Sequence, residues 1–347
     1  MTVDYSKCPW PWFGGKTHAA PVVWEALGDV DHYIEPFAGS LAVLLRRPHP
    51  ANRAYKSETV NDADGLLINF WRSVQLDPEA TAEAASWPVA EADLHARHLA
   101  LLRWKAEQPL ERMMADPHWH DARMAGWWAW GQSSWLGTGW CSGRGPWVIG
   151  EDGRITKQGG GRGVSRQVPT LSNNGEGVNH AGTRAWGVGD PFHPMTMPEL
   201  RAWLKFLSAR LRHVRILNGD WSRAVSRGVI LTRGVRDGGV AGIFLDPPYS
   251  HAAQRSDGLY AVDDKEVANE VREVARERAK DPRTRIVIAG FEGEHDSLVQ
   301  DGWKVAEWYR RGYDTGGRGR QQHRERLWIS PHCLQPRRQL GFDMVSM

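Results

Sequence analysis

The segment Asp246-Pro247-Pro248-Tyr249 carries the clearest chemistry in this chain of 347 residues. It directly follows Gly242-Ile243-Phe244-Leu245, an apolar run that predicts a short buried strand. Two successive prolines lack backbone N–H groups and stiffen the chain, so the local carbonyls and the Asp246 carboxylate act as hydrogen-bond acceptors. A rigid row of acceptors beside the Tyr249 ring suits a planar base that carries an exocyclic amine.

Three other turns follow predicted strands in the same way. They are Glu35-Pro36-Phe37-Ala38-Gly39, Asn61-Asp62 and Asn218-Gly219-Asp220. In open α/β sheets, ligands bind beyond the carboxyl ends of the strands. Taken alone, Pro-Pro-Tyr could be an isolated turn or a polyproline ligand. The repeated pattern of a strand followed by an acidic or glycine-containing turn favours a binding site instead.

Alternating helices and strands must position these turns. Ser40 is the predicted N-cap of a helix at residues 41–47. The other predicted helices lie at residues 19–27, 66–74, 199–212 and 262–280, and the other predicted strands at 31–35, 214–217, 285–289, 304–308 and 325–329, the last two as a closing hairpin. Short apolar strands between helices predict a mostly parallel, Rossmann-like α/β sheet covered on both faces.

The α/β pattern is interrupted in the middle of the chain. We predict one α/β domain formed by residues 1–75 and 191–335, a separate inserted lobe at residues 76–190, and a tail at residues 336–347. The lobe begins with a helical stretch at residues 79–115 and continues into a stretch rich in tryptophan. Residues 150–184 are rich in glycine and arginine, a composition typical of a mobile loop.

Composition excludes several classes of protein. A hydrophobic fraction of 41% supports a packed core, and no apolar run approaches the ~20 residues of a membrane-spanning helix. The net charge of +3 is weak evidence for a nucleic-acid partner. Cys8, Cys141 and Cys333 are widely separated, and His95, His98, His118 and His120 have no matching cysteine set, so no metal site is expected. A reducing, cytoplasmic compartment suits this cysteine usage.

Four motifs together resemble a known enzyme family. Trp12-Phe13-Gly14-Gly15-Lys16, Glu35-Pro36-Phe37-Ala38-Gly39-Ser40, Asn61-Asp62 and Asp246-Pro247-Pro248-Tyr249, in this order, are similar to those of the Dam-type (D12 class) DNA adenine-N6 methyltransferases. The order of the pieces is that of the family's alpha arrangement. The resemblance covers roughly residues 9–75 and 196–331. One departure is Leu41, where the family often has a second glycine.

The resemblance implies that the N-terminal half binds S-adenosyl-L-methionine. It places Trp12 and Lys16 on the methionine side of the cofactor, Phe37 and Gly39 in the turn beneath it, Asp62 at the ribose and Asp220 near the adenine. The full expected cofactor set is Trp12, Gly14, Gly15, Lys16, Glu35, Pro36, Phe37, Gly39, Ser40, Asp62, Asp220 and Asp246. Purely structural roles remain as alternatives, because Asp62 and Asp220 fit helix caps, Phe37 fits a core position and Gly14-Gly15-Lys16 fits a simple turn.

The resemblance also implies a catalytic set and a DNA partner. Asp246, Pro247, Pro248 and Tyr249 would hold a flipped-out adenine, with Tyr249 stacking on the base. The inserted lobe would select the target in double-stranded DNA, although most of its tryptophans suit a core. Candidate DNA contacts, each of which also fits a solvated surface position, are Trp135, Arg144, Arg154, Lys157, Arg162, Arg166, Arg318 and Arg320.

Other functions remain open at this point. The chain could methylate another nucleic-acid amine, such as cytosine N4 in DNA or guanine N2 in RNA. It could also be a catalytically inactive DNA-binding relative, against which the intact Asp246–Tyr249 segment argues. Its context could be phage-borne, orphan or restriction–modification, the last with a cognate restriction enzyme encoded separately.

Overall fold

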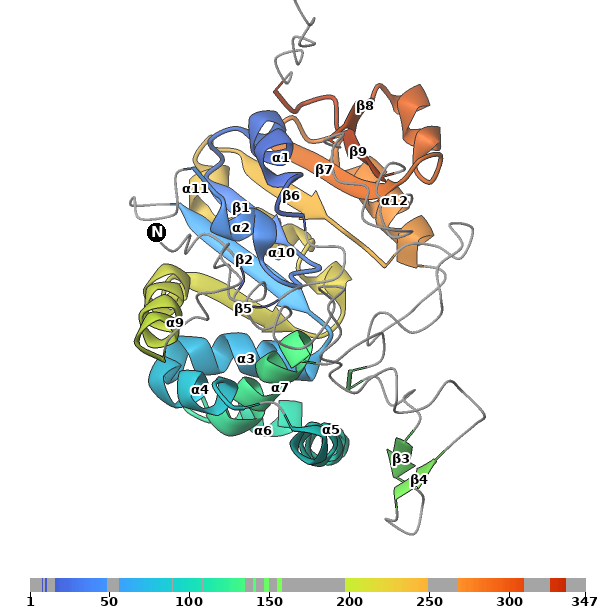
Figure 1. Cartoon of the computed structure of the whole chain (residues 1–347). Coiled ribbons are helices and arrows are strands. Elements are labelled where there is room, and N and C mark those ends of the chain that lie inside the picture. Colours follow the sequence, from blue (N-terminus) through green and yellow to red (C-terminus); the bar gives the residue numbers. More distant parts are fainter. Residues whose placement is uncertain are drawn as a thin grey trace, which may run out of the picture.

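The computed structural model describes residues 8, 10, 16–48, 56–88, 90–107, 109–134, 140–141, 147–149, 155–157, 197–248, 267–308 and 325–334 (Figure 1). Predictions for residues outside these ranges are not tested by the structure and remain predictions. They include Trp12, Gly14, Gly15, Tyr249 and the candidate DNA contacts, except that Lys157 has a described backbone.

A seven-stranded sheet forms the centre of the described structure, in the order β5-β2-β1-β6-β7-β9-β8. The strands are β1 (His32–Glu35), β2 (Ser57–Asp62), β5 (Val214–Asn218), β6 (Ala241–Leu245), β7 (Thr284–Phe291), β8 (Lys304–Glu307) and β9 (Glu325–Ile329). The strands from β5 to β7 are parallel, whereas β9 runs antiparallel to β7 and to β8. This mixed sheet confirms the predicted Rossmann-like α/β fold and its closing hairpin.

Helices cover both faces of this sheet (Figure 1). They are α1 (Ala20–Leu27), α2 (Ala42–Leu45), α3 (Gly65–Leu76), α9 (Met197–Leu211), α10 (Arg227–Ile230), α11 (Arg233–Arg236) and α12 (Val267–Arg278). Alternate strand residues enter opposite cores. Tyr33 and Phe244 pack with α1, α3 and α9, whereas Ile34 and Ile243 pack with α10, α11 and α12. This two-sided burial explains why the strands are apolar runs rather than alternating patterns.

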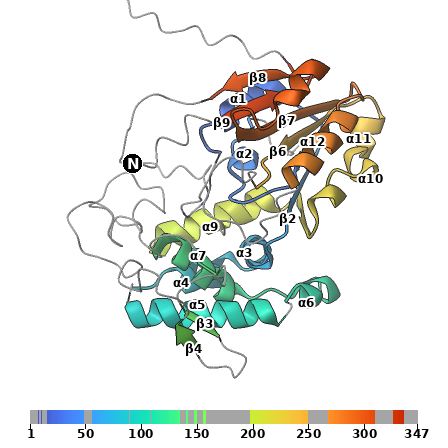
Figure 2. The same ribbon diagram turned by 90° about the vertical axis from the view of Figure 1, so that its right-hand side faces the viewer.

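The middle of the chain forms a helical layer, which lies beyond β5 in Figure 1 and below α3 and α9 in Figure 2. It contains α4 (Pro78–Ala85), α5 (Glu91–Ala106), α6 (Pro109–Ala115) and α7 (Ala122–Ser134). The helical stretch predicted at residues 79–115 therefore consists of the first three of these helices. Asp77 begins α4, because its carboxylate accepts a hydrogen bond from the backbone N–H of Ala80. Helix α4 packs against α7 and α9, and α3 also packs against α7.

Tryptophan side chains join this helical layer to the sheet domain. Trp10 lies between Phe70, Trp71 and Trp128, with ring centroids 4.3, 5.2 and 5.2 Å away. Phe70 and Trp71 belong to α3, and Trp128 belongs to α7. Trp104 and Trp128 thus belong to the same core as α3 and the sheet, whereas Trp130 packs with Leu94 in a small separate cluster and Trp87 is exposed.

Two further features bear on the predictions. Strands β3 (Trp147–Ile149) and β4 (Ile155–Lys157) form an antiparallel pair. The predicted mobile loop at residues 150–184 thus contains the short strand β4, the rest of it lies outside the described residues, and its mobility remains a prediction. Among the residues that the structure describes, no helix is long and apolar enough to cross a membrane.

Candidate functional site

The candidate site lies at the carboxyl ends of β1, β2, β5 and β6. Strand β1 pairs with β2 on one side and with β6 on the other, and β2 pairs with β5. The chain runs outward in opposite directions from β1 and β6, which makes this the topological switch point where α/β sheets bind ligands. The turns that follow these strands therefore meet at one edge of the sheet, as the sequence predicts.

Lys16 and Asp246 form an ion pair at this edge. The Lys16 Nζ lies 2.9 Å from Asp246 Oδ2 and 3.7 Å from Glu325 Oε2. Only 3% of the Lys16 side chain is exposed. Asp246 follows β6 directly, and Glu325 begins β9 opposite the last residue of β7. The structure thus brings Lys16 to the predicted catalytic carboxylate, and it adds Glu325, which the sequence analysis missed because its signal was only that of a strand.

Glu35 is buried beneath the turn that follows β1. Its Oε2 accepts hydrogen bonds from the Tyr33 hydroxyl at 3.0 Å and from the Leu44 backbone N–H at 3.2 Å. The pKa of Glu35 is raised to about 8, mainly by burial and to a smaller degree by the nearby Asp246 charge. Both hydrogen bonds oppose this shift. Glu35 therefore holds a proton at neutral pH and joins β1 to α2.

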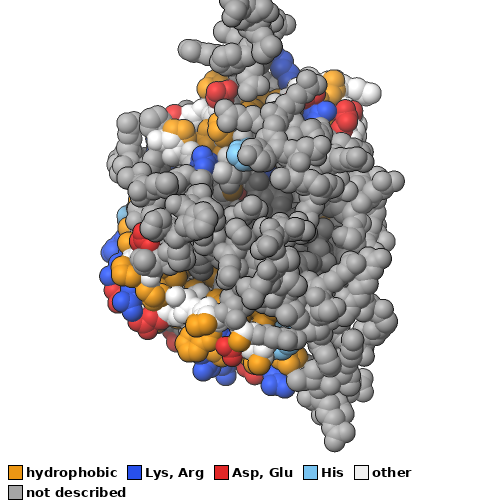
Figure 3. Space-filling view, viewed as in Figure 1, with side chains coloured by type: hydrophobic (Ala, Val, Ile, Leu, Met, Phe, Trp, Pro, Cys, Tyr) orange, Lys and Arg blue, Asp and Glu red, His pale blue; other side chains and the backbone are white. Residues whose placement is uncertain are grey.

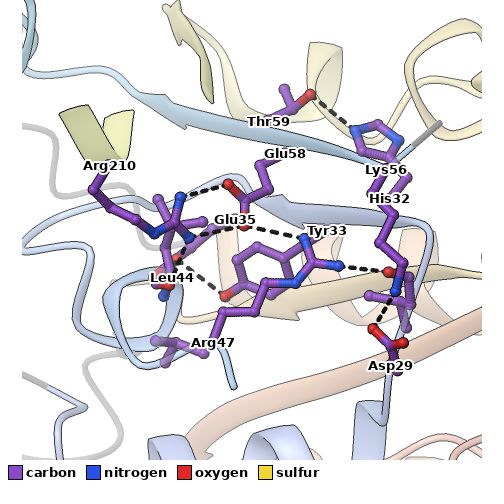
Figure 4. Close-up of polar contacts among 12 residues, drawn as sticks. Asp29, His32, Tyr33, Glu35, Leu44, Arg47, Lys56, Glu58, Thr59 and Arg210 are labelled. Atoms are coloured by element: carbon purple, nitrogen blue, oxygen red, sulfur yellow. Dashed lines mark hydrogen bonds and ion pairs between the residues drawn. The ribbon is translucent and has the colours of Figure 1, made fainter. Parts of the chain in front are cut away.

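A second buried network lies behind Glu35 (Figure 4). Glu58 accepts hydrogen bonds from Arg47 at 3.0 Å and from Arg210 at 2.7 Å. Arg210 also donates to the Leu44 carbonyl at 3.1 Å. These contacts join α2 and α9 to β2. They hold the short helix that follows the Phe37–Leu41 turn.

The turn itself depends on two residues with positive φ. Gly39 has φ 46° and Leu41 has φ 56°. The Gly39 backbone N–H donates to Asp62 Oδ2 at 3.0 Å, and its carbonyl accepts from Trp71 Nε1 at 3.1 Å. Leu41 thus adopts the left-handed conformation that glycine adopts without strain, at the place where the resembling family often has glycine.

The predicted capping role of Ser40 is wrong. Helix α2 begins at Ala42, its N-cap is Leu41, and no side chain caps it. A capping serine requires extended backbone at the cap, whereas the positive φ of Leu41 turns the chain sharply before the helix. Ser40 is buried in the turn instead.

Asp62 connects the turn after β1 to the start of α3. Its Oδ2 accepts from Gly39, and its Oδ1 accepts from the Asp64 backbone N–H at 2.9 Å. Asp64, rather than Asp62, caps α3 through Leu66. Burial raises the pKa of Asp62 to about 6, although the backbone hydrogen bonds oppose this shift. A carboxylate has about four acceptor positions, so Asp62 keeps capacity for a ligand hydroxyl.

Asn61 is a part of the site to which sequence reasoning gave no role of its own. Its Nδ2 donates to the carbonyls of Pro36 and Gly219, each at 3.0 Å, so it joins the turns after β1 and β5. Asn61 is 1% exposed, and its buried Oδ1 has no hydrogen-bond partner among the residues that the structure describes. An unpaired buried acceptor costs about 1–3 kcal/mol, which a ligand donor would recover.

The turn after β5 supplies a buried aromatic ring and an exposed carboxylate. Phe37 stacks on Trp221 with ring centroids 5.6 Å apart and planes 28° apart. Asp220 accepts hydrogen bonds from the backbone and hydroxyl of Ser222, so the capping alternative describes its present contacts. It caps a short 3-10 helix at Trp221–Arg223 and remains solvent-exposed.

No group of three or more metal-ligating side chains occurs in the part of the chain that the structure describes. Cys8, Cys141 and Cys333 are free thiols.

Comparison with known proteins agrees with this geometry. Residues 12–94 match the model of a family described as D12 class N6 adenine-specific DNA methyltransferase. The matched span contains Lys16, the turn after β1 and Asp62, and it continues past residue 75 through α4. A search of curated proteins gives no significant match. The match confirms the resemblance for the N-terminal motifs, from Trp12 to Asp62, and it does not extend to the Asp246–Tyr249 segment.

Proposed function

From the match of residues 12–94 to the D12 class, we propose that this chain transfers a methyl group from S-adenosyl-L-methionine to adenine N6 in double-stranded DNA. The observation that carries the assignment of the site is the buried Lys16 beside Asp246 at the end of β6. It places a charged carboxylate, held by a fixed cation, where the fold binds ligands.

The residues at the strand ends suit this cofactor. Asn61 Oδ1 is a buried acceptor without a partner, and Asp62 keeps free acceptor capacity. Such acceptors fit ribose hydroxyls or an adenine amine. The half-buried Phe37 ring, which stacks on the buried Trp221, lies in the turn after β1, and Asp220 in the turn after β5 has an exposed carboxylate. We propose that Asp62 binds the ribose and that Asp220 lies near the cofactor's adenine.

Asp246 is the proposed catalytic residue. Its carboxylate and the Pro247 carbonyl would accept the two hydrogens of the target amine, which exposes the nitrogen lone pair. The bound cofactor supplies a methyl group on a positively charged sulfur, so the reaction requires mainly alignment. The negative charge of Asp246 stabilises the positive charge that develops on the amine. Lys16 orients this carboxylate from the buried side.

Access to the base requires that the adenine leave the duplex. We propose that Tyr249 stacks on the flipped base, and that the helical layer from α4 to α7 with the segment that follows it selects the target sequence. The match to the family supports contact between this layer and DNA, since α4 and the start of α5 lie within the matched residues.

Nucleoside analysis tests the proposal. Purified protein is incubated with labelled cofactor and a pool of duplex DNA that contains all short sequences, and the DNA is then digested to nucleosides. The proposal predicts N6-methyl-2′-deoxyadenosine as the labelled product. Label in N4-methylcytosine, label in RNA guanine when RNA is offered instead, or no label with either substrate would overturn it in favour of the corresponding alternative.

A further inference from the structure

A cleft on the helical layer combines tryptophan rings with arginines. It has a volume of about 540 Å³ and is lined by Ala80, Glu83, Ala84, Trp87, Asp93, Ala96, Arg97, Arg123 and Trp127. These residues belong to α4, α5, α7 and the turn after α4. The cleft is separate from the strand ends, since none of the residues placed there lines it.

Arg97 is the central cation of this cleft. Its guanidinium carbon lies 4.3 Å from the ring centroid of Trp130, 5.1 Å from that of Trp87 and 5.3 Å from that of Trp127. Arg97 is 6% exposed, and within the described part of the chain its buried Nη1 has no hydrogen-bond partner. Cation–π contacts hold the guanidinium in place but leave this donor unsatisfied.

Two carboxylates also line the cleft. Glu83 accepts from Arg201 at 2.7 Å, and Asp93 accepts from Trp87 Nε1 at 3.0 Å. Asp93 lies close enough to interact electrostatically with Arg97 but forms no ion pair with it. Both carboxylates keep acceptor capacity, so the case for an anionic or acceptor-rich ligand rests on the buried Arg97 Nη1 donor and on the exposed Arg123 guanidinium.

A second arginine and exposed ring faces complete the site. Arg123 is exposed, and its guanidinium lies 5.3 Å from the Trp127 ring centroid. Trp87 is 54% exposed, which is unusual for so large an apolar ring. Hydrophobic side chains also gather over the lower helices in the space-filling view, bordered by charged ones (Figure 3). Flat aromatic faces beside arginine donors match a planar, anionic ligand.

We propose that this cleft binds an unpaired nucleotide of the DNA strand, with the base on Trp87 and Trp127 and the phosphate on Arg97 and Arg123. The inference rests on the proposed function, because it takes DNA as the substrate. Tryptophan faces stack on any base, and arginine contacts to phosphate add a salt-dependent attraction. The cleft would thus hold the strand away from the reacting adenine, on the helical layer.

Binding of a short single-stranded oligodeoxynucleotide tests the cleft directly. Trp87→Ala and Arg123→Ala change exposed side chains, so the protein should remain folded. We expect Trp87→Ala to weaken binding about tenfold and Trp87→Phe to restore most of the affinity. Arg123→Ala should reduce the slope of log affinity against log salt concentration by the amount expected for about one phosphate contact. Phe206→Ala on α9 and Arg233→Ala on α11 are matched exposed controls and should bind as the wild type does.

Methyl transfer to pooled duplex DNA separates the two proposals. If the cleft acts as proposed, Trp87→Ala and Arg123→Ala raise the KM for DNA and leave kcat nearly unchanged. Wild-type protein that methylates DNA, together with cleft variants that bind and turn over like the controls, overturns the cleft and leaves the proposed function intact. Wild-type protein that transfers no methyl group to DNA refutes the proposed function, and oligonucleotide binding then still decides the cleft.

Discussion

The Nζ of Lys16 lies 2.9 Å from Asp246 Oδ2, so a buried cation joins the segment before α1 to the end of β6. Glu325 approaches the same Nζ from β9, at 3.7 Å. The three charges lie where water is largely excluded. Lys16 attracts both carboxylates, which repel each other, so loss of Lys16 leaves two nearby negative charges without this cation between them.

Replacement of Lys16 should destabilise the fold strongly. Lys16→Met leaves Asp246 and Glu325 facing each other without a cation, and we expect the free energy of unfolding to fall by about 3 kcal/mol. The double variant Lys16→Met/Glu325→Gln should recover part of this loss, because one of the two charges is removed. Urea unfolding measures both changes. The exposed pair Lys205 and Glu79 is the control, and Lys205→Met should cost less than about 1 kcal/mol. A Lys16→Met variant as stable as this control would contradict the coupling.

Glu35 should make stability depend on pH. Its pKa is raised from 4.5 to about 8 in the folded protein, so the folded state binds more protons than the unfolded state between these values. Stability from this group is complete below pH 4.5 and is lost as pH rises to about 8. Glu35→Gln keeps a neutral acceptor and should melt at a higher temperature than the wild type at pH 8.5. Melting curves from pH 4.5 to 8.5 measure the difference, which should be absent for Glu292→Gln at an exposed site. Parallel curves for Glu35→Gln and the wild type would show that Glu35 is ionised when folded.

Much of the fold could be predicted because each element carries a local signal. Apolar runs such as residues 242–245 and 285–289 became β6 and β7, and the acidic turns lie together because the carboxyl ends of parallel strands share one edge. Helical spacing at residues 199–212 likewise became α9. These signals depend on a few neighbouring residues and need no tertiary information.

The contacts of the site were not predictable in the same way. The roles of Glu325 and Asn61 depend on which strands become neighbours, and no spacing along the chain encodes that. The sequence marked Ser40 as a cap because serine is a good capping residue, but burial of Leu41 forces the chain into a left-handed turn. Here tertiary packing overrides the local preference. The division into a sheet domain and an inserted lobe remains a prediction. Trp10 and Trp128 share one hydrophobic core with α3.

Two substitutions at Leu41 can show whether the backbone there is strained. Its side chain is fully buried, so both Leu41→Ala and Leu41→Gly should lose about 2–5 kcal/mol of packing. Leu41→Ala keeps the cost of φ 56°, whereas Leu41→Gly removes it. Leu41→Gly should therefore be more stable than Leu41→Ala by about 1 kcal/mol, as measured by chemical unfolding. A more stable alanine variant would show that the turn is not strained at this residue.

Asp62 should control cofactor binding through the turn after β1. Asp62→Asn directs an amide N–H toward the Gly39 or Asp64 backbone N–H, so one of these hydrogen bonds is lost. We expect the affinity for S-adenosyl-L-methionine to fall by about tenfold or more, which corresponds to about 1.5–3 kcal/mol for a hydrogen bond to a charged group. Titration calorimetry measures this change, with the exposed Asp237→Asn as control.

The pH dependence of cofactor binding gives a second readout of Asp62. Its pKa of about 6 in the free protein predicts that binding by the wild type weakens as pH falls through this value, because the carboxylate gains a proton. Asp62→Asn should lack this dependence. Equal affinity of Asp62→Asn and the wild type at pH 7.5 would remove Asp62 from the cofactor site.

The central claim is that the Asp246 carboxylate contacts the target amine, and separate measurement of methyl transfer and cofactor binding tests it most directly. Asp246→Asn preserves size and Asp246→Ala removes the group; thermal melting shows whether each remains folded beside Lys16. We predict that both variants bind S-adenosyl-L-methionine nearly as the wild type does, while methyl transfer to DNA falls by at least about a hundredfold and is abolished in Asp246→Ala. Folded Asp246→Ala protein that methylates DNA at the wild-type rate would contradict the account.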